Sequence, residues 1–378
     1  MKKSQNGRRD FLKASLGTAA VMTSMQTTGA AAQNASRPAR TPRIRFSVIG
    51  LNHDHINGQT QAVIRGGGEL VSVYAKEPEL LAAFTKRFPQ AKPARSEKEI
   101  LEDATVQLVV SASIPNERAP LGIQVMRHGK DFMVDKPGIT SLAQLAEARR
   151  VQAETKRIYS ILYSERLEQP STVKAGELVK AGAIGRVLQT VGLGPHRTNI
   201  KNRPSWFFER ERYGGIITDI ASHQFDQFLF FTGSTRAEIV ASQVGNLHHP
   251  QYPGLEDFGD VMLRGDGGTG YIRVDWFTPN GLSTWGDGRL TILGTDGYIE
   301  LRKYVDVAGR SGGNHLFLVD QKEMRHIDCK DTPLPYGERL VDDVLNRTET
   351  AVPQAHTFLA MELALTAQAK AQRIPARS

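Results

Sequence analysis

The feature that most constrains the fold is a regular alternation of apolar runs and amphipathic segments between residues 44 and 163. Short apolar runs predict buried strands, and the longer periodic segments between them predict helices. The expected strands are Ile44–Ile49, Leu70–Tyr74, Val106–Ser111, Asp131–Val134 and Tyr159–Tyr163, and the expected helices are Gln59–Arg65, Pro78–Phe88, Pro120–His128 and Leu142–Lys156. Because helical crossovers join strands that run in the same direction, residues 44–160 are predicted to form an α/β Rossmann-like domain with a parallel sheet. Ligands of such sheets bind at the carboxyl ends of the strands.

Residues 161–378 follow a different pattern, in which short alternating strands are separated by Gly and Asp turns such as 265–268. The expected strands are Val187–Val191, Ile239–Val244, Asp257–Leu263, Gly270–Trp276, Arg289–Leu293 and Tyr298–Leu301, and the expected helices are Thr172–Ala181, Tyr336–Leu345 and Ala355–Gln372. This half is predicted to be an α+β domain with a mostly antiparallel open sheet covered by helices on one side. The oligomeric state stays open, although the open face invites a partner subunit and a homo-oligomer could form through it. A chain of 378 residues suits two such domains.

The first residues are predicted to be a targeting segment. The run Arg8-Arg9-Asp10-Phe11-Leu12-Lys13 resembles the twin-arginine export signal, and small residues follow near Ala32. Residues 1–32 are therefore interpreted as a twin-arginine signal peptide and residues 33–43 as a linker, with a periplasmic or otherwise exported mature protein. The apolar stretch is too short for a stable membrane span. Cys329 is the single cysteine, so no internal disulfide can form, in agreement with export of a protein already folded in the cytoplasm.

Without the targeting segment the chain is only weakly basic, and it has no run of Lys and Arg interleaved with aromatic residues. Nucleic acid is therefore not an expected partner. A small-molecule ligand is indicated instead by polar groups that follow the predicted strands.

The turn after the first strand, residues 50–55, is the first of these features. A dinucleotide-binding turn reads G-x-G-x-x-G, and here only Gly50 is kept, while Asn52 and His55 stand at the other glycine positions. Asn tolerates the left-handed backbone conformation and can cap a helix, so the turn can survive. Gly50, Asn52, His53 and His55 are therefore candidate cofactor-binding residues. The alternative interpretation is an N-capped turn with solvated histidines.

The second feature, after the second strand, is Ala75-Lys76. Sites that prefer NAD usually place an acidic residue there for the ribose hydroxyls. Ala75 lacks a carboxylate and Lys76 adds a cation, which favours the 2′-phosphate of NADP. An ordinary exposed lysine is the alternative for Lys76.

Two further segments carry candidate catalytic residues. Lys136 in Asp135-Lys136-Pro137 stands at the end of an apolar strand, where its ammonium group could steady negative charge on a substrate oxygen. In the stretch Gly214–Asp226, Asp219 and His223 are four residues apart and are expected to share one face of a helix. A carboxylate beside an imidazole orients the ring and raises its affinity for a proton, as a general acid/base requires. We therefore expect a histidine-like acid limb in the activity, at about pH 6 to 7.

The order of these features resembles the Gfo/Idh/MocA oxidoreductase family over about residues 44–375. The resemblance rests on Asp135-Lys136-Pro137, on Gly182-Ala183-Ile184-Gly185, on Gly214-Gly215 followed by Asp219 and His223, and on Leu293-Gly294-Thr295-Asp296-Gly297. It implies a cofactor, NADP or NAD, that accepts hydride from a sugar, cyclitol or related polyol. It also implies that Lys136 holds the reacting hydroxyl, that His223 is the acid/base, and that Asp219 orients His223 or binds a sugar hydroxyl.

The glycine fingerprint departs from the family pattern, and so does the loop 114–119 after the third strand. Pro115 and Asn116 in this loop are expected to line the cofactor site, while Ala119 stands where the family commonly has a histidine. Some relatives hold the cofactor tightly and use transient oxidation, in glycoside cleavage or between two sugars. No resident metal is expected.

Two alternatives from other classes stay open. The first is a metal-dependent hydrolase, because His53-x-His55 after a strand also resembles the metal motif of amidohydrolase barrels, with Lys136, His196, His223 and Asp260 in a compatible order. The second is a non-catalytic sugar-binding protein. The sequence does not specify the substrate, since Arg203, Arg210, Arg212 and Trp206 could contact an acidic or a neutral sugar.

Overall fold

A six-stranded parallel sheet forms the centre of the first half of the protein, as predicted. The computed structural model describes residues 42–375. The strand order is β3-β2-β1-β4-β5-β6, and each neighbouring pair is parallel. The strands are β1 (Ile44–Ile49), β2 (Gly68–Tyr74), β3 (Lys92–Pro93), β4 (Leu108–Ser111), β5 (Asp131–Asp135) and β6 (Tyr159–Leu162). β1, β4, β5 and β6 are almost wholly buried, which explains their continuous apolar sequences.

The helices between these strands are α1 (His55–Arg65), α2 (Pro78–Arg87), α3 (Glu97–Glu102), α4 (Pro115–Arg127) and α5 (Leu142–Thr155). α3 and α5 begin where the Ser96 and Ser141 hydroxyls accept backbone N–H groups. The sequence missed β3 and α3, and it placed the start of α4 five residues too late. Pro115 is the first residue of α4, a position where the missing N–H of proline costs nothing. Pro115 and Asn116 therefore belong to a helix start and not to a loop.

A nine-stranded sheet dominates the second half, in the order β14-β13-β12-β11-β7-β10-β9-β8-β15. The strands are β7 (Val187–Pro195), β8 (Ala237–Gly245), β9 (Phe258–Gly265), β10 (Thr269–Asp275), β11 (Arg289–Gly294), β12 (Gly297–Arg302), β13 (His315–Asp320), β14 (Met324–Ile327) and β15 (Gln372–Arg373). Only the β7–β10 and β8–β15 pairs are parallel, so the prediction of a mostly antiparallel sheet is confirmed. The last three strands in sequence were not predicted.

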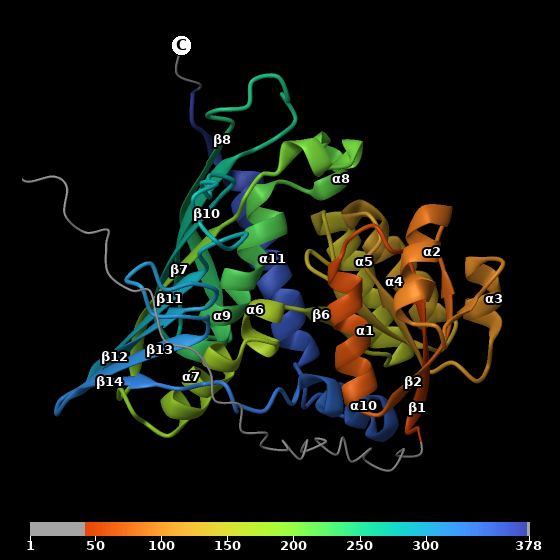
Figure 1. Ribbon diagram of the computed structural model, residues 1–378, viewed down its shortest axis with the longest axis horizontal. Helices are drawn as coiled ribbons and strands as arrows, with labels where there is room; N and C mark the ends of the chain where they lie inside the picture. Colours follow the sequence, from red (N-terminus) through yellow and green to blue (C-terminus); the bar gives the residue numbers. More distant parts are fainter. Residues whose placement is uncertain (1–41, 376–378) are drawn as a thin grey trace, which may run out of the picture. The chain divides into compact units, whose positions relative to one another are not determined.

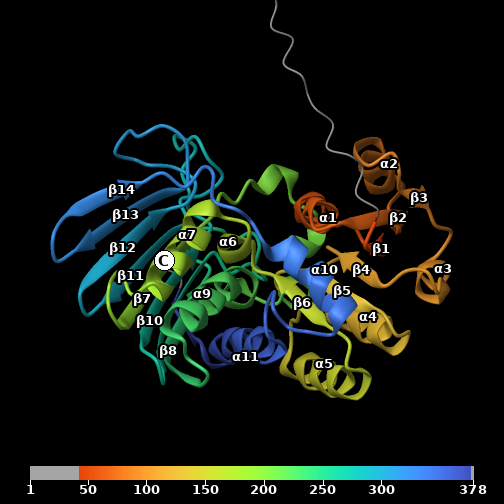
Figure 2. The ribbon, with the colours of Figure 1, turned by 90° about the horizontal axis from the view of Figure 1, so that it is seen from below.

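Helices cover one face of this large sheet, the face that is turned toward the six-stranded sheet (Figures 1 and 2). α7 (Pro170–Lys180), α9 (Ser222–Thr232) and α11 (Gln354–Lys370) contact its strands. The other helical segments of this half are α6 (Ser164–Leu167), α8 (Arg210–Tyr213) and α10 (Tyr336–Asn346), with 3₁₀ turns at Ile200–Asn202 and Ser205–Phe208 and a π-helix, η3 (Ile217–Ala221). The sheet also carries exposed apolar side chains, among them Val240, Met262, Leu293 and Tyr298. Among the described residues, no helix combines the length and apolar character that a membrane crossing needs.

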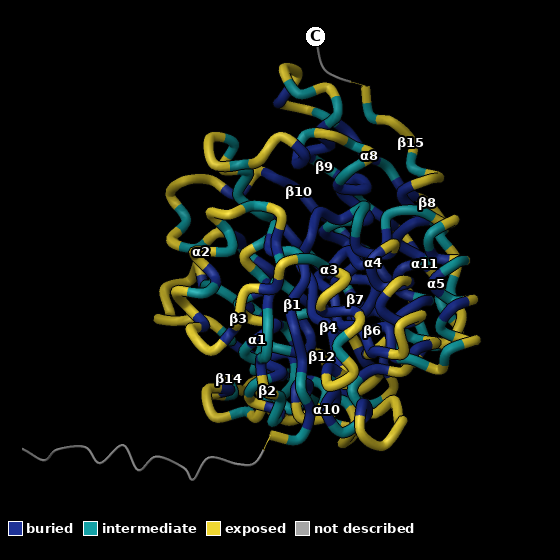
Figure 3. Tube along the Cα trace, turned by 90° about the vertical axis from the view of Figure 1, so that its right-hand side faces the viewer, coloured by how far each residue is buried: buried dark blue, intermediate teal, exposed yellow. Residues whose placement is uncertain are grey.

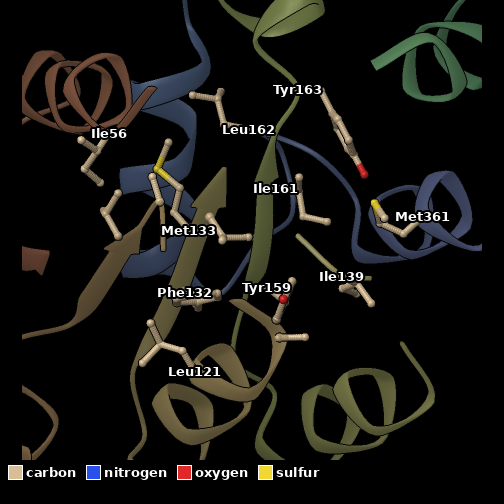
Figure 4. Packing of buried hydrophobic residues seen from close by; sticks show 14 of the residues in the cluster. Ile56, Leu121, Phe132, Met133, Ile139, Tyr159, Ile161, Leu162, Tyr163 and Met361 are labelled. Atoms are coloured by element: carbon tan, nitrogen blue, oxygen red, sulfur yellow. The ribbon is translucent and has the colours of Figure 1, made fainter. Parts of the chain in front are cut away.

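The last two helices join the two halves. α11 contacts β8, α9 and η3 of the second half and also α5 and β6 of the first. α10 lies against α1 so closely that a Cβ on Gly66 would be 2.2 Å from the carbonyl oxygen of Gly337. Figure 4 shows Phe132 and Ile161 of the first sheet in one apolar cluster with Met361 of α11. In Figure 3, buried residues occupy the centre of the molecule and exposed residues lie around it.

Candidate active site

The turn after β1 keeps the conformation that a nucleotide-binding turn requires. Gly50 has φ +83°, and a Cβ there would lie 2.6 Å from the Cβ of Ser113, so the backbones of β1 and the segment after β4 approach each other only because residue 50 is glycine. α1 begins at His55, directly beyond the turn. A helix N-terminus at the carboxyl end of β1 presents N–H groups to an anion.

A cavity of about 360 Å³ lies at the carboxyl ends of β1, β2 and β4. Gly50, Asn52, Lys76 and Asn116 all line it, so the structure brings these predicted cofactor-binding residues together. The side-chain Oδ1 of Asn116 is buried without a hydrogen-bond partner among the described residues. An unsatisfied acceptor in a polar cavity is what a bound polar ligand would explain. The residues fit a dinucleotide in this position.

Two charged residues that line the cavity, Lys76 and Glu77, bear on ribose recognition. Glu77 lines it, and its Oε1 accepts a hydrogen bond of 2.8 Å from Asn52 Nδ2. The Lys76 ammonium lies 3.5 Å from a Glu117 carboxylate. A carboxylate is therefore present two residues after Ala75, and the cation that favoured a 2′-phosphate already has an anionic partner.

His53 and His55 lie beside Asp135 at the end of β5. His55 Nδ1 is 2.9 Å from one Asp135 oxygen, and His53 Nδ1 is 3.7 Å from the other. Desolvation raises the pKa of Asp135, but the charges of His55 and Arg118 outweigh it, and its pKa is well below the ordinary value. Desolvation lowers the pKa of His53 strongly, and His55 lowers it further. At neutral pH this cluster therefore contains a carboxylate and an uncharged His53.

The ligand atoms of His53, His55 and Asp135 lie within 4.8 Å of one another, so a metal ion must be considered. However, the buried guanidinium of Arg118 lies 3.2 Å from Asp135 and also donates to the carbonyl oxygens of Ser113 and Lys136. A fixed cation at that distance opposes a second cation, because Arg118 and Asp135 are both buried away from water. The arrangement fits a divalent metal poorly, and it suits imidazoles beside the anionic part of a dinucleotide.

The predicted catalytic lysine pairs with the predicted catalytic aspartate. Lys136 Nζ donates to Asp219 Oδ1 at 3.0 Å, and the two side chains expose 5% and 13% of their surface. Lys136 follows β5, whereas Asp219 lies in η3 of the second half, so the pair bridges the two halves. π-turns inside helices often occur at functional sites, because the extra residue re-aims one side chain.

The expectation that Asp219 orients His223 is wrong for this structure. Asp219 contacts Lys136, and within the described chain the buried Nδ1 of His223 has no hydrogen-bond partner. The expected rise in proton affinity is also wrong, because desolvation lowers the pKa of His223 to about 3. The largest opposing influence is the carboxylate of Glu165.

Glu165 belongs to a buried polar cluster beside His223 that sequence reasoning missed. Its Oε2 accepts hydrogen bonds from Lys303 Nζ at 2.6 Å and from Gln224 Nε2 at 3.1 Å. Desolvation raises the pKa of Glu165, but Lys303 and His223 oppose this, and its pKa is about 2. Residues 165 and 303 are far apart in sequence and show no motif, so only the fold brings them together. Arg118 of α4 also belongs to no sequence motif, and only the fold brings it to Asp135.

The hydrolase alternative fails first at Asp260, which does not join His53 and His55. Asp260 lies on β9, where its carboxylate accepts hydrogen bonds from Gln243 and Tyr271. Lys136 is held by Asp219, and a two-sheet architecture is not an eight-fold barrel. The barrel interpretation is therefore wrong.

A parallel sheet with a ligand cavity at its strand ends, joined to a large open sheet by a buried Lys–Asp pair, defines the class of two-domain dinucleotide-binding oxidoreductases. Comparison with known families makes this specific. The description "Oxidoreductase family, NAD-binding Rossmann fold" matches residues 44–163, and the GFO/IDH/MocA C-terminal domain matches residues 172–300. The chain belongs to the Gfo/Idh/MocA family.

Among solved structures, the chain is 47% identical to a candidate oxidoreductase from Erwinia carotovora atroseptica SCRI1043, with a TM-score of 0.86 over 88% of this chain and 100% of that one. Among curated proteins, it is 27% identical to dehydrogenase aclE of Aspergillus oryzae over 50% of this chain and 55% of that protein. It is 24% identical to the levoglucosan dehydrogenase of Pseudarthrobacter phenanthrenivorans over 52% and 51% of the two chains. The matches to these two curated relatives thus span about half of their length.

Proposed function

We propose that this protein is an NAD(P)-dependent oxidoreductase that acts on a CH–OH group of a sugar, cyclitol or related polyol. The observation that carries the proposal is the Lys136–Asp219 pair at the carboxyl edge of a sheet whose nucleotide cavity is formed. Similarity to a levoglucosan dehydrogenase supports a carbohydrate substrate. A bound nicotinamide nucleotide would supply the hydride acceptor in this site.

The protein's own groups then have distinct tasks. The Lys136 ammonium, held in place by Asp219, donates a hydrogen bond to the substrate oxygen and stabilises negative charge that develops on it. His223 is uncharged at neutral pH, so it can accept the hydroxyl proton. The carboxylate of Glu165 stabilises the imidazolium that results, because it raises the proton affinity of the ring.

We further propose export of the folded protein through the twin-arginine route, with the cofactor retained. Residues 1–32 carry the motif, and they lie outside the described residues. Free nicotinamide nucleotides are scarce outside the cytoplasm, so a released cofactor would not be replaced. Asn52 and His55 stand where other dinucleotide sites have glycine, and side chains there favour retention because they can cover the pyrophosphate. A retained cofactor must be reoxidised in place, either by a second substrate or by return of hydride, as in glycoside cleavage through transient oxidation.

One experiment tests these proposals together. The mature protein is purified from the periplasm without added nucleotide and denatured, and the released nucleotide is identified by chromatography. We expect a near-stoichiometric nucleotide, and NAD more than NADP, because Lys76 is paired with Glu117 while Glu77 faces the cavity. Protein that is empty and shows no nucleotide binding on titration would contradict the oxidoreductase proposal. Empty protein that binds added nucleotide weakly would contradict retention alone.

A further inference from the structure

A cluster of aromatic side chains lies where β7 and β10 end. The ring of His196 is 4.5 Å from the ring of Trp285 and 5.4 Å from that of Trp276. His196 is half-buried, and its pKa is lowered to about 4, first by desolvation and then by the charge of Lys136. His196 follows β7, in which a Cβ on Gly194 would lie 3.2 Å from Ile220, the residue after Asp219 in η3, so His196 lies close to the part of η3 that holds Asp219. Trp285 exposes 46% of its surface, so a large apolar plane is available to a ligand there.

Arg203 packs against the same aromatic cluster. Its guanidinium carbon lies 4.3 Å from the ring centre of Phe207 and 5.0 Å from that of Trp276. Its Nε donates to the carbonyl oxygen of Thr198 at 2.8 Å, and its Nη2 to that of Arg197 at 3.3 Å. These contacts fix the plane of the guanidinium, while Nη1 has no hydrogen-bond partner in the described part of the chain.

Arg203 is connected to the proposed site through Trp276, because Trp276 directly follows β10 and β10 contacts η3, which holds Asp219. Desolvation lowers its pKa, and the two charges that oppose this are the carboxylates of Asp219 and Asp54. Asp219 is the partner of Lys136, and Asp54 precedes α1 at the nucleotide-binding turn. The contacts and the charges together place Arg203 on the side of the site where Asp219 lies.

Arg203 also differs from the other arginines of this region. Arg210 Nε lies 3.2 Å from Glu256, and Arg212 has carboxylates of Glu117 and Glu209 within 3.9 Å. Within residues 42–375, no carboxylate forms an ion pair with Arg203. Trp206, which the sequence offered as a sugar contact, exposes only 9% of its surface and packs against Phe207 instead.

A partly desolvated guanidinium that is oriented, uncompensated and next to an aromatic plane is a site for an anion with an apolar face. We propose that the substrate is a sugar acid, whose carboxylate binds Arg203 Nη1 while its C–H face packs on Trp285. This inference rests on the proposed oxidoreductase function and specifies the substrate class of that site.

The test compares sugars that differ in one carboxylate, such as D-glucuronate with D-glucose and D-gluconate with D-glucitol, on the full mature protein with its nucleotide. We expect the acid of each pair to have the higher kcat/KM. Arg203→Met should lower kcat/KM for the acid by about 10- to 100-fold, mainly through KM, and lower kcat/KM for the neutral sugar much less. Arg203→Lys should restore part of the preference.

The matched control is Arg210→Met, which removes an arginine that already has a carboxylate partner and should keep the preference. Thermal unfolding and nucleotide content verify that each variant is folded. A wild-type protein that favours neutral sugars, or an Arg203→Met variant with an unchanged preference, would overturn the proposal.

Failure of the redox proposal gives a different result. If no sugar is turned over, calorimetric titration with D-glucuronate still reports on the anion site. Binding to the wild type that is lost in Arg203→Met would support the acid subsite without the reaction. Absence of D-glucuronate binding to the wild type would reject the subsite.

Discussion

Lys136 is the residue on which the proposed chemistry depends most directly. Lys136→Met should reduce turnover by roughly 100-fold or more, since it removes a charge that acts on the developing oxyanion. The matched control is Lys130→Met, because Lys130 is equally buried but donates to the carbonyl oxygen of Val106. That control should lose stability and keep most of its turnover per folded molecule. Similar turnover in the two variants would remove Lys136 from the mechanism.

His223 provides a prediction about pH. Its folded pKa of about 3 lies below the ordinary value of 6.5 because of burial, so the unfolded chain takes up the proton first as pH falls. The stabilisation is therefore fully present above pH 6.5 and is lost as the pH falls from 6.5 toward 3. Urea unfolding at pH 7 and pH 4.5 should show a smaller loss of stability for His223→Gln than for the wild type.

The rate profile provides the second half of that prediction. The acid limb of kcat/KM that His223 contributes should lie well below the histidine range. An acid limb near pH 6.5 that disappears in His223→Gln would show that the ring is hydrated in solution and would contradict the lowered pKa.

At the scale of elements, the start of η3 depends on a single glycine. Gly215 has φ +94°, and a Cβ there would lie 2.3 Å from Gln368 Oε1, which accepts the N–H of Ile217 at 2.9 Å. Gly215→Ala should therefore destabilise the protein by several kcal/mol and shift Asp219 away from Lys136.

A control for this prediction exists in Gly182. Its φ is +80°, but a Cβ added there would have no other atom within 4 Å, so Gly182→Ala meets the backbone strain alone. It should cost only about 1 kcal/mol and leave turnover unchanged. Equal losses in thermal unfolding for the two variants would mean that the contact with Gln368 is not decisive.

The elements also show what sequence periodicity can predict. The buried strands of the first half were predicted because they are continuous apolar runs bounded by glycine and polar residues. β13 and β14 were missed because long polar turns isolate them, and β15 has only two residues. The π-helix was missed because one extra residue in a turn does not alter the apolar pattern. The spacing of Asp219 and His223 therefore predicted a contact between these two residues, whereas Asp219 contacts Lys136. The choice of both as site candidates depended only on the motif.

For the whole molecule, the uncovered face of the large sheet predicts a dimer. Met262 exposes 53% of its surface on β9, and Val240, Leu293 and Tyr298 are further exposed apolar side chains of the same sheet. We expect the wild type to sediment as a dimer and Met262→Asp to sediment as a monomer, because a buried charge opposes association. Leu142→Asp, on α5, is the matched control for an exposed apolar residue. A monomeric wild type would show that this face has no second copy as its partner.

The close contact of Gly66 with Gly337 also has a consequence for the order in which the protein is made. α1 leaves the ribosome early, whereas α10, which covers it, is among the last helices to be synthesised. During translation, α1 of the nascent nucleotide-binding half is therefore not yet covered by α10. It reaches its final form only after the end of the chain has been released. A chain truncated before Tyr336 would lose that cover although every strand of the first sheet is present, so we expect its nucleotide-binding half to be less stable than in the full chain.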